Sequence, residues 1–430
     1  MIFICTMRSA ILLLFLPLTK AFSLQASSSA RPSTSLSAYN EVDRRSAILQ
    51  GSTTAGFALS SLLLSPNEVS ALQDYDDSAK KRILITGSNS GIGMDAAQRM
   101  ALRGHEVVLA CRTLNKANEA ADKIKTMIAN DADDAVAAIS TIKSLKLIPM
   151  ECDLADLSSI DTFVKQNSGA KFDAVCYNAG IARNTEAKDV ARTKQGFELT
   201  VGTNHLGHFY LNQLILPSIK DNGRIVVTAS GVHDPDSPGG AQGVPATLGD
   251  LAGLEKAAAG DGKFDMVDGG AFNADKAYKD SKLCNVLFTR ELQRRLDEKG
   301  SNIKANCFNP GLIVVSLTKR GQFTKPLLGT GLFRDQNQLF TKVFDVAATK
   351  LLKVGETTHW GGGALEYMTL SSNVGKQGGM YYTSPPGSSK YGEDAFGREF
   401  KLSQVSKEAK SSDDGKAKRF WELSEKLVGV

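Results

Sequence analysis

The sequence is poor in cysteine, and its cysteines lack the spacing of metal sites. Six cysteines occur in 430 residues, one of them is Cys5 near the N-terminus, and none forms a CxxC pair. This spacing suggests neither a zinc site nor a disulfide framework, so we predict no bound metal. We expect the others to be buried free thiols. They are Cys111, Cys152, Cys176, Cys284 and Cys307.

A strong charge of either sign is also missing. The formal net charge is +5, and no basic residues concentrate on one stretch, which argues against nucleic acid as a partner. After residue 72 no apolar run is long enough to span a bilayer. The composition, 42% hydrophobic and 23% charged, is that of a soluble globular protein.

The first 71 residues differ from the rest. Residues 9–19, SAILLLFLPLT, resemble a signal-peptide core, and residues 23–40 are rich in Ser and Ala and free of acidic side chains. This order resembles the bipartite presequences of algae with secondary plastids. We therefore predict a plastid presequence over 1–71, a catalytic domain over 80–430, and location in the stroma or at the thylakoid surface. Arg44-Arg45 before a mildly apolar stretch leaves a twin-arginine route to the thylakoid lumen as an alternative.

Strand-like and helix-like segments alternate from residue 82 onward. The alternation predicts a doubly wound parallel sheet, an α/β Rossmann-type fold with helices on both faces. The long connections 232–272 and 312–345 are expected to be substrate loops. Residues 131–146 read as a polar, Ala-rich insertion, and the charged tail 404–418 as a mobile or surface helix. The predicted strands are 83–85, 106–110, 147–151, 173–177, 224–228 and 303–307, and the predicted helices are 91–103, 115–130, 156–166, 196–220 and 275–298.

A glycine-rich loop follows the first predicted strand, in the stretch ILITGSNSGIG at 83–93. Glycines permit a tight turn and a close backbone approach, and the next helix offers free N–H groups to an anion. A glycine triplet alone is equally compatible with an ordinary loop. We predict that this loop binds a cofactor phosphate through Thr86, Gly87, Ser88, Asn89, Ser90, Gly91, Ile92 and Gly93.

Residues after the other predicted strands suit the rest of a dinucleotide. Arg112 follows the second strand, where an arginine suits a 2′-phosphate and favours NADPH over NADH. Asp153 follows the third strand and is expected to accept from the adenine amine. A surface arginine is the alternative for Arg112. The remaining predicted cofactor residues are Leu154, Asn178, Ala179, Gly180, Lys282, Pro310 and Gly311.

Four residues form a candidate catalytic set. Tyr278 and Lys282 lie four positions apart, hence on one helix face, and an ammonium near a phenol lowers the phenol's pKa so that it can donate a proton. Ser230 follows the fifth strand as the third member, and Asn204 is expected to hold a water that relays protons to Lys282. The YxxxK spacing alone would describe a solvated helix face. Together with the glycine loop and the strand-end residues it predicts an oxidoreductase.

These motifs, over residues 82 to 312, resemble those of the short-chain dehydrogenase/reductase family. The resemblance implies a Rossmann fold and hydride transfer to or from NAD(P), with the glycine loop around the pyrophosphate.

Five stretches resemble one branch, the light-dependent NADPH:protochlorophyllide oxidoreductases. The resemblance implies NADPH-dependent reduction of the C17–C18 double bond of protochlorophyllide in chlorophyll biosynthesis, with Tyr278 as proton donor and the pigment absorbing the photon. It leaves open peripheral association with the thylakoid membrane and a homo-oligomer. The stretches are FELTVGTNHLGHF (197–209), LGDLAGL (248–254), VDGGAFNADKAYKDSKLCN (267–285), GLFR with a following LF (331–340) and FWELSEKLVGV (420–430).

The sequence departs from that branch in two places. Leu312 follows Pro310-Gly311 where the branch typically has cysteine, although Cys284 matches, and the loop SNSGIG is closer to general family members. His205 and His208 are expected to be structural, not metal ligands. Candidate pigment-pocket aromatics, each with core packing as its alternative, are Phe323, Phe333, Phe340, Tyr381 and Tyr382.

Two other functions fit the same residues. One is a dark NADPH-dependent carbonyl or retinol-type reductase in the plastid, which the leucine at 312 favours. The other is a non-catalytic NADPH-binding or assembly protein at the thylakoid surface, against which the intact catalytic set argues.

Overall fold

The computed structural model describes residues 75, 79–131, 134–185, 187–313, 355–391, 396–411 and 415–430. The predicted presequence lies outside the described residues. So do most of the 312–345 connection and its aromatic candidates Phe323, Phe333 and Phe340. Among the described residues, no helix combines the length and the apolar character needed to cross a membrane.

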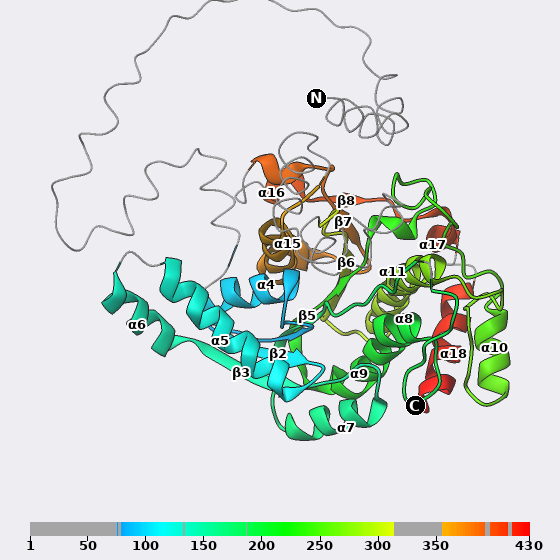
Figure 1. Ribbon diagram of the computed structural model, residues 1–430, viewed down its shortest axis with the longest axis horizontal. Helices are drawn as coiled ribbons and strands as arrows, with labels where there is room; N and C mark the ends of the chain where they lie inside the picture. The colour runs from blue at the N-terminus through cyan, green and yellow to red at the C-terminus, as the bar shows by residue number, and fades with distance from the viewer. Residues whose placement is uncertain are drawn as a thin grey trace, which may run out of the picture. The chain divides into compact units, whose positions relative to one another are not determined.

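A sheet of eight strands organises the described residues, in the order β3-β2-β1-β4-β5-β6-β7-β8 (Figure 1). All neighbours pair in parallel except β8, which runs antiparallel to β7. The order reverses between β1 and β4, as expected of a doubly wound fold, so the predicted fold class is confirmed. The strands are β1 (Arg82–Thr86), β2 (Glu106–Cys111), β3 (Lys146–Glu151), β4 (Phe172–Tyr177), β5 (Ile219–Thr228), β6 (Lys304–Phe308), β7 (Tyr381–Thr383) and β8 (Lys401–Ser403).

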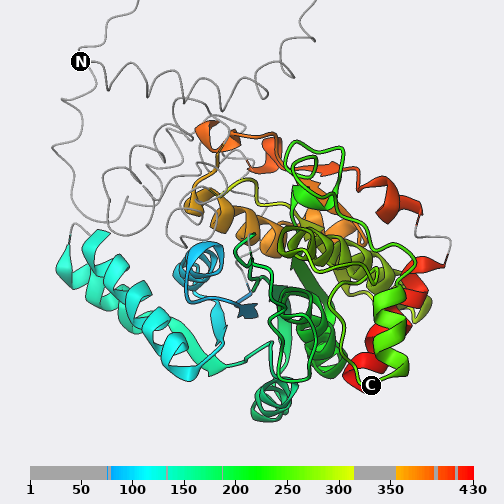
Figure 2. The ribbon, with the colours of Figure 1, turned by 45° about the vertical axis from the view of Figure 1, so that its right-hand side comes forward.

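Helices cover both faces of this sheet (Figures 1 and 2). α4 (Gly91–Leu102), α5 (Leu114–Asp131) and α15 (Thr358–Leu370) cover one face, and α7 (Leu157–Gln166), α9 (Gly207–Ile215) and α11 (Ala274–Glu298) cover the other. The remaining helices are α6 (Ala135–Ser144), α8 (Leu199–Val201), α10 (Ala252–Ala259), α16 (Phe396–Glu399), α17 (Lys407–Ser411) and α18 (Lys416–Val428).

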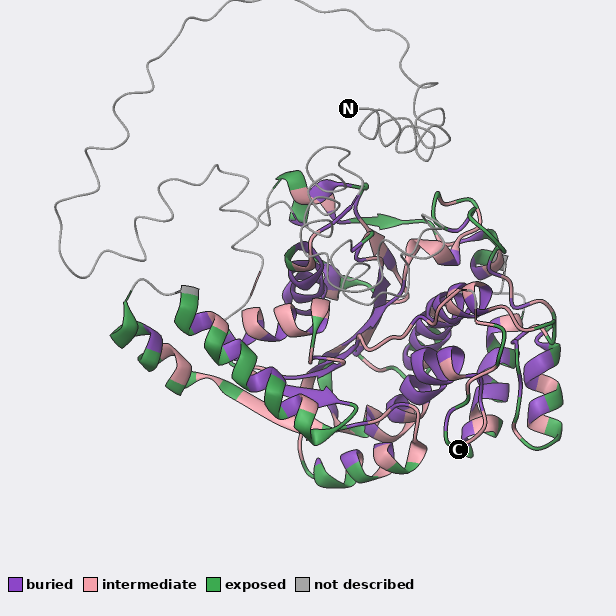
Figure 3. Ribbon diagram, in the orientation of Figure 1, coloured by how far each residue is buried: buried purple, intermediate pink, exposed green. Residues whose placement is uncertain are grey.

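Alternate side chains of β1 enter the two cores. Ile83 and Ile85 pack in the core beneath α4 and α15, whereas Leu84 packs in the core beneath α9 and α11. This alternation follows from the two-residue period of a strand. Figure 3 shows the consequence, because the strands at the centre of the sheet and the sheet-facing sides of the helices are mostly buried, whereas the edge strands β3 and β8 are intermediate or exposed.

The predicted helix 196–220 is too long. α9 ends at Ile215, a short 3-10 turn containing Pro217 follows, and β5 already begins at Ile219. Proline has no N–H to continue the helical ladder, so the helix stops there. The predicted strand 224–228 is therefore only the second half of β5.

Two other segments contain helices that were not predicted. The insertion 131–146 contains α6, whose N-terminus is capped by Asp134, which accepts from the Val136 N–H at 2.9 Å. The connection 232–272 contains α10. The segment 404–418, predicted as a mobile or surface helix, contains α17 and the start of α18, and α17 docks through buried Ser406 and Ala409.

Candidate active site

The glycine loop joins β1 to α4 and needs its glycines for two different reasons. Gly87 and Gly91 have φ angles of +68° and +60°, which side chains rarely tolerate. Gly93 has ordinary backbone angles, but a Cβ there would lie 2.5 Å from Asn178 Nδ2 and 2.5 Å from the Gly87 carbonyl oxygen. The loop is thus folded tightly against the end of β4.

The N-terminus of α4 is open to an anion. Ser90 is its N-cap residue but makes no side-chain cap hydrogen bond, and the first turn contains no acidic residue. Its first N–H groups therefore stay available, and the helix dipole adds positive potential there. The loop and this helix end suit the pyrophosphate of a dinucleotide, because a Cβ on Gly91 would meet nothing within 4 Å and the backbone there is open to a ligand.

Residues at the ends of β2 and β3 flank this loop. Arg112 follows β2, is exposed, and makes no hydrogen bond or ion pair with any described residue. Ser88 is buried, with its Oγ 3.4 Å from Cys111 Sγ. Asp153 follows β3 and accepts from the Ala155 N–H at 3.0 Å, while Leu154 is buried.

Thr86 ties the loop to the segment after β4. Its Oγ1 accepts from the N–H groups of Asn178 and Ala179, both at 3.0 Å. Asn178 Nδ2 donates back to the Thr86 carbonyl at 3.0 Å. Next to these residues, a Cβ on Gly180 would lie 3.5 Å from both Asn204 Oδ1 and Lys282 Nζ. The small residues of this segment therefore stand between the loop and the predicted catalytic side chains.

Tyr278 and Lys282 lie on α11, whose start is capped by Asn273, which accepts from the Lys276 N–H at 2.9 Å. Lys282 Nζ stands 5.6 Å from the centroid of the Tyr278 ring and donates to the Thr228 carbonyl at 3.0 Å. The lysine is only 4% exposed, so little water screens its charge from the ring.

Asn204 lies in a single turn of π-helix, Gly202–Leu206, just before α9. Its side chain bonds both backbone groups of Ile181, accepting at 2.7 Å and donating at 2.9 Å, and donates to Ser281 Oγ at 3.0 Å. π-helical turns are frequent at functional sites, and this one brings the amide beside Lys282.

Ser230 follows β5 and starts a short 3-10 turn, Gly231–His233. Its Oγ accepts from the Val232 N–H at 3.4 Å, and its carbonyl accepts from His233 Nδ1 at 2.7 Å. Since β5 ends at Thr228, whose carbonyl holds Lys282, the structure places Ser230 at the same end of the sheet as the other three residues.

The last predicted cofactor residues follow β6. Pro310 is buried, and Gly311 has a φ of +85° with Glu356 packed against its Cα. Leu312 is 52% exposed. Tyr381, a candidate for the pigment pocket, is instead a core residue, which was the alternative interpretation. Its ring is buried and packs edge-on against His233.

Sequence reasoning missed the role of His208. This buried histidine donates from Nδ1 to the Asn204 carbonyl at 3.0 Å, and its Nε2 accepts from Thr86 Oγ1 at 2.9 Å. Burial, together with the charge of Lys282, lowers the pKa of His208 to about 4, so the ring is neutral at pH 7. The available signal was its position four residues after Asn204, on the same helix face.

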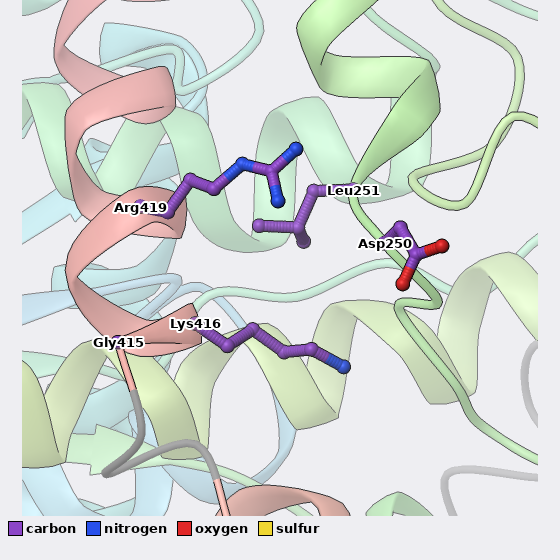
Figure 4. A pocket seen from close by; sticks show the side chains of 5 residues that line it. All are labelled: Asp250, Leu251, Gly415, Lys416 and Arg419. Atoms are coloured by element: carbon purple, nitrogen blue, oxygen red, sulfur yellow. The ribbon is translucent and has the colours of Figure 1, made fainter.

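A separate pocket of about 400 Å³ lies between the starts of α10 and α18 (Figure 4). Its two cations are already paired, Lys416 with Glu408 and Arg419 with Glu255. None of the predicted site residues lines it. The lining residues are Asp250, Leu251, Gly415, Lys416 and Arg419.

Comparison with known proteins agrees with this geometry. The family model described as short chain dehydrogenase matches residues 81–242. The chloroplastic protochlorophyllide reductase of Cucumis sativus is 33% identical over 358 residues, 82% of this chain and 78% of that protein. Protochlorophyllide reductase A of Oryza sativa subsp. japonica is 33% identical over 356 residues, 81% of this chain and 80% of that protein.

A solved structure also matches. It is the crystal structure of an uncharacterized protein from Mycobacterium paratuberculosis. Its superposition on this chain gives a TM-score of 0.54 with 26% sequence identity, and the matched region covers 83% of this chain and 97% of the other protein's chain. On its fold and on this similarity, the chain belongs to the short-chain dehydrogenase/reductase family and is an NAD(P)-dependent oxidoreductase.

Proposed function

We propose that this chain uses NADPH to reduce protochlorophyllide to chlorophyllide in a light-dependent reaction in the plastid. The observation that carries the proposal is the extent of similarity to protochlorophyllide reductases. It covers 358 residues, whereas the general family model matches only 81–242. The similarity must therefore include much of the chain outside the nucleotide-binding half. The relatives' description as chloroplastic supports the predicted plastid location.

The cofactor would be held by this chain's own residues. The loop Gly87–Gly93 and the open end of α4 suit its pyrophosphate, and the unpaired Arg112 suits a 2′-phosphate. Asp153 would accept from the adenine amine. When bound, NADPH supplies the hydride.

The catalytic set would handle the proton. Tyr278 would donate the proton to the carbon of the double bond that does not receive the hydride. The buried Lys282 ammonium would then stabilise the Tyr278 phenolate that results. Asn204 holds the segment at Ile181 in place beside them. Ser230 completes the set from the end of β5.

The direct test mixes the purified chain with NADPH and protochlorophyllide in darkness. The absorption spectrum is recorded, the sample is flashed with red light, and the spectrum is recorded again. A light-dependent shift to the chlorophyllide band supports the proposal and shows that Leu312 is tolerated. Bound pigment without any shift contradicts it.

A dark carbonyl or retinol-type reductase is the second candidate. It is favoured by one observation, the exposed leucine at 312 where the resembling branch typically has cysteine. NADPH consumption in darkness with an aromatic aldehyde or retinal, and no photochemical shift, would support this reaction in place of the first.

A further inference from the structure

Two buried histidines connect catalytic segments to the C-terminal part of the chain. The first is His233, which is 1% exposed. A carbonyl can only accept, so Nδ1 carries the proton and donates to the Ser230 carbonyl at 2.7 Å. Nε2 then accepts from the Ser406 N–H at 3.2 Å. Both ring nitrogens are used, one on the predicted catalytic serine and one on the C-terminal part.

The second is His205, the residue after Asn204. Ser424 Oγ donates to the Phe420 carbonyl at 2.8 Å, so it must accept from His205 Nε2, which lies 3.2 Å away. The His205 ring also stacks on Phe420, with centroids 4.6 Å apart. The two histidines therefore use opposite tautomers, and His205 bonds only through Nε2, because its Nδ1 makes no hydrogen bond with a described residue.

The C-terminal segment, defined here as the described residues 404–411 and 415–430, is well anchored. Ser406 caps α17 by accepting from the Ala409 N–H at 3.2 Å. Glu408 accepts from the Leu248 N–H at 3.0 Å and from Lys416 Nζ at 3.0 Å. Trp421 packs against the rings of Phe209 and Phe288. Figures 1 and 2 both show α18 beside α11.

We propose that the C-terminal segment is a positioning element of the active site, which holds Ser230 through His233 and the Asn204 turn through His205. The inference rests on the proposed function only in assuming that Ser230 and Asn204 serve the reaction. Ordinary packing would bury these helices against any apolar surface. Here each link ends on the peptide group of a predicted catalytic residue or on its direct neighbour.

The His233 link is tested in the full chain with two changes at one position. Ser406→Pro removes the N–H that His233 accepts from, whereas Ser406→Ala keeps that N–H and removes only the helix cap. We expect Ser406→Pro to lower kcat about tenfold to a hundredfold, with the Kd for NADPH unchanged. Ser406→Ala should keep kcat within about twofold of the wild type. If Ser406→Pro does not fold, His233→Asn replaces it, since its amide can reach Ser230 but not Ser406.

The His205 link is tested by Ser424→Ala, and each variant serves as the control for the other. Amide hydrogen exchange is followed by mass spectrometry in the absence of substrate. We expect faster exchange over 229–234 only in Ser406→Pro, and over 203–207 only in Ser424→Ala. Unchanged exchange in both segments, with unchanged kcat, would overturn the inference. Because exchange needs no substrate, this result is independent of whether the pigment reaction proves correct.

Discussion

At the scale of single residues, the proposed proton donor is one hydroxyl group, that of Tyr278. Tyr278→Phe removes it and leaves the ring beside Lys282 in place. We expect NADPH binding to persist and kcat to fall about a hundredfold to ten-thousandfold, the usual contribution of a general acid. Turnover measurements and NADPH fluorescence titration check this.

The matched control is Tyr210→Phe. It makes the same chemical change on α9, where the Tyr210 hydroxyl donates to Asp161 at 2.7 Å. This variant should keep its kcat. Normal turnover in Tyr278→Phe would show that the proton comes from another group.

Cofactor preference is also decided at residue scale. Arg112→Asp replaces an exposed, unpaired cation with an anion at the end of β2. We expect the Kd for NADPH to rise at least tenfold, since a charge-assisted hydrogen bond contributes about 1.5–3 kcal/mol, while the Kd for NADH stays similar or falls. Lys125→Asp makes the same charge change at an exposed position of α5, where Lys125 is paired with Asp122, and should alter neither constant. An unchanged NADPH affinity in Arg112→Asp would remove the 2′-phosphate argument.

At the scale of elements, Gly91 of the glycine loop has a matched control in Gly300, which lies outside that loop. Gly91 and Gly300 have φ angles of +60° and +65°, and a Cβ on either would meet nothing within 4 Å. Each Gly→Ala change therefore costs about 1–2 kcal/mol of left-handed strain, measured as the free energy of unfolding. We expect only Gly91→Ala to lose NADPH affinity as well, by isothermal titration, because only it lies at the open end of α4. Equal affinity in the two variants would argue against phosphate binding by this loop.

At the scale of the whole molecule, buried histidines make stability depend on pH. Burial lowers the pKa of His205 to about 3 and that of His208 to about 4. The unfolded chain takes up these protons near pH 6.5 and the folded chain does not, so stability falls as pH drops from 6.5 toward 4. Each histidine contributes about 1.4 kcal/mol per pH unit to that slope.

Other groups titrate in the same range, so the prediction is made as a difference. Burial raises the pKa of Asp280, which acts on stability in the opposite direction. His205→Phe leaves Asp280 in place and retains a ring against Phe420. Urea unfolding between pH 4 and 6.5 should show a slope smaller than the wild type by about 1.4 kcal/mol per pH unit. An identical slope would mean that His205 is protonated in the folded chain.

Much of the fold was predictable, for a local reason. Most of strands β1 to β6 contain a short apolar run bounded by turn residues, and Ser230 and most predicted cofactor residues follow directly after these runs. Tyr278, Lys282 and Asn204 lie instead on helical segments, and the YxxxK spacing gave the signal for the first two. The three-residue strands β7 and β8 are too short to give such a signal. The prediction of one helix over 196–220 was wrong at its C-terminal end. The apolar pattern did not reveal that the helix stops before Pro217 and that β5 begins at Ile219.

The sequence alone determined the fold class and the family, and it predicted the cofactor loop and the catalytic set, because these depend on residues at fixed local spacings along the chain. Only the tertiary structure decided how that site is held. His208 reaches Thr86 across 122 positions of sequence, and His205 reaches Ser424 across 219. No periodicity encodes such pairs. They form because the tertiary fold packs segments that are distant in sequence around these buried imidazole rings, where a polar nitrogen gains from a hydrogen-bond partner.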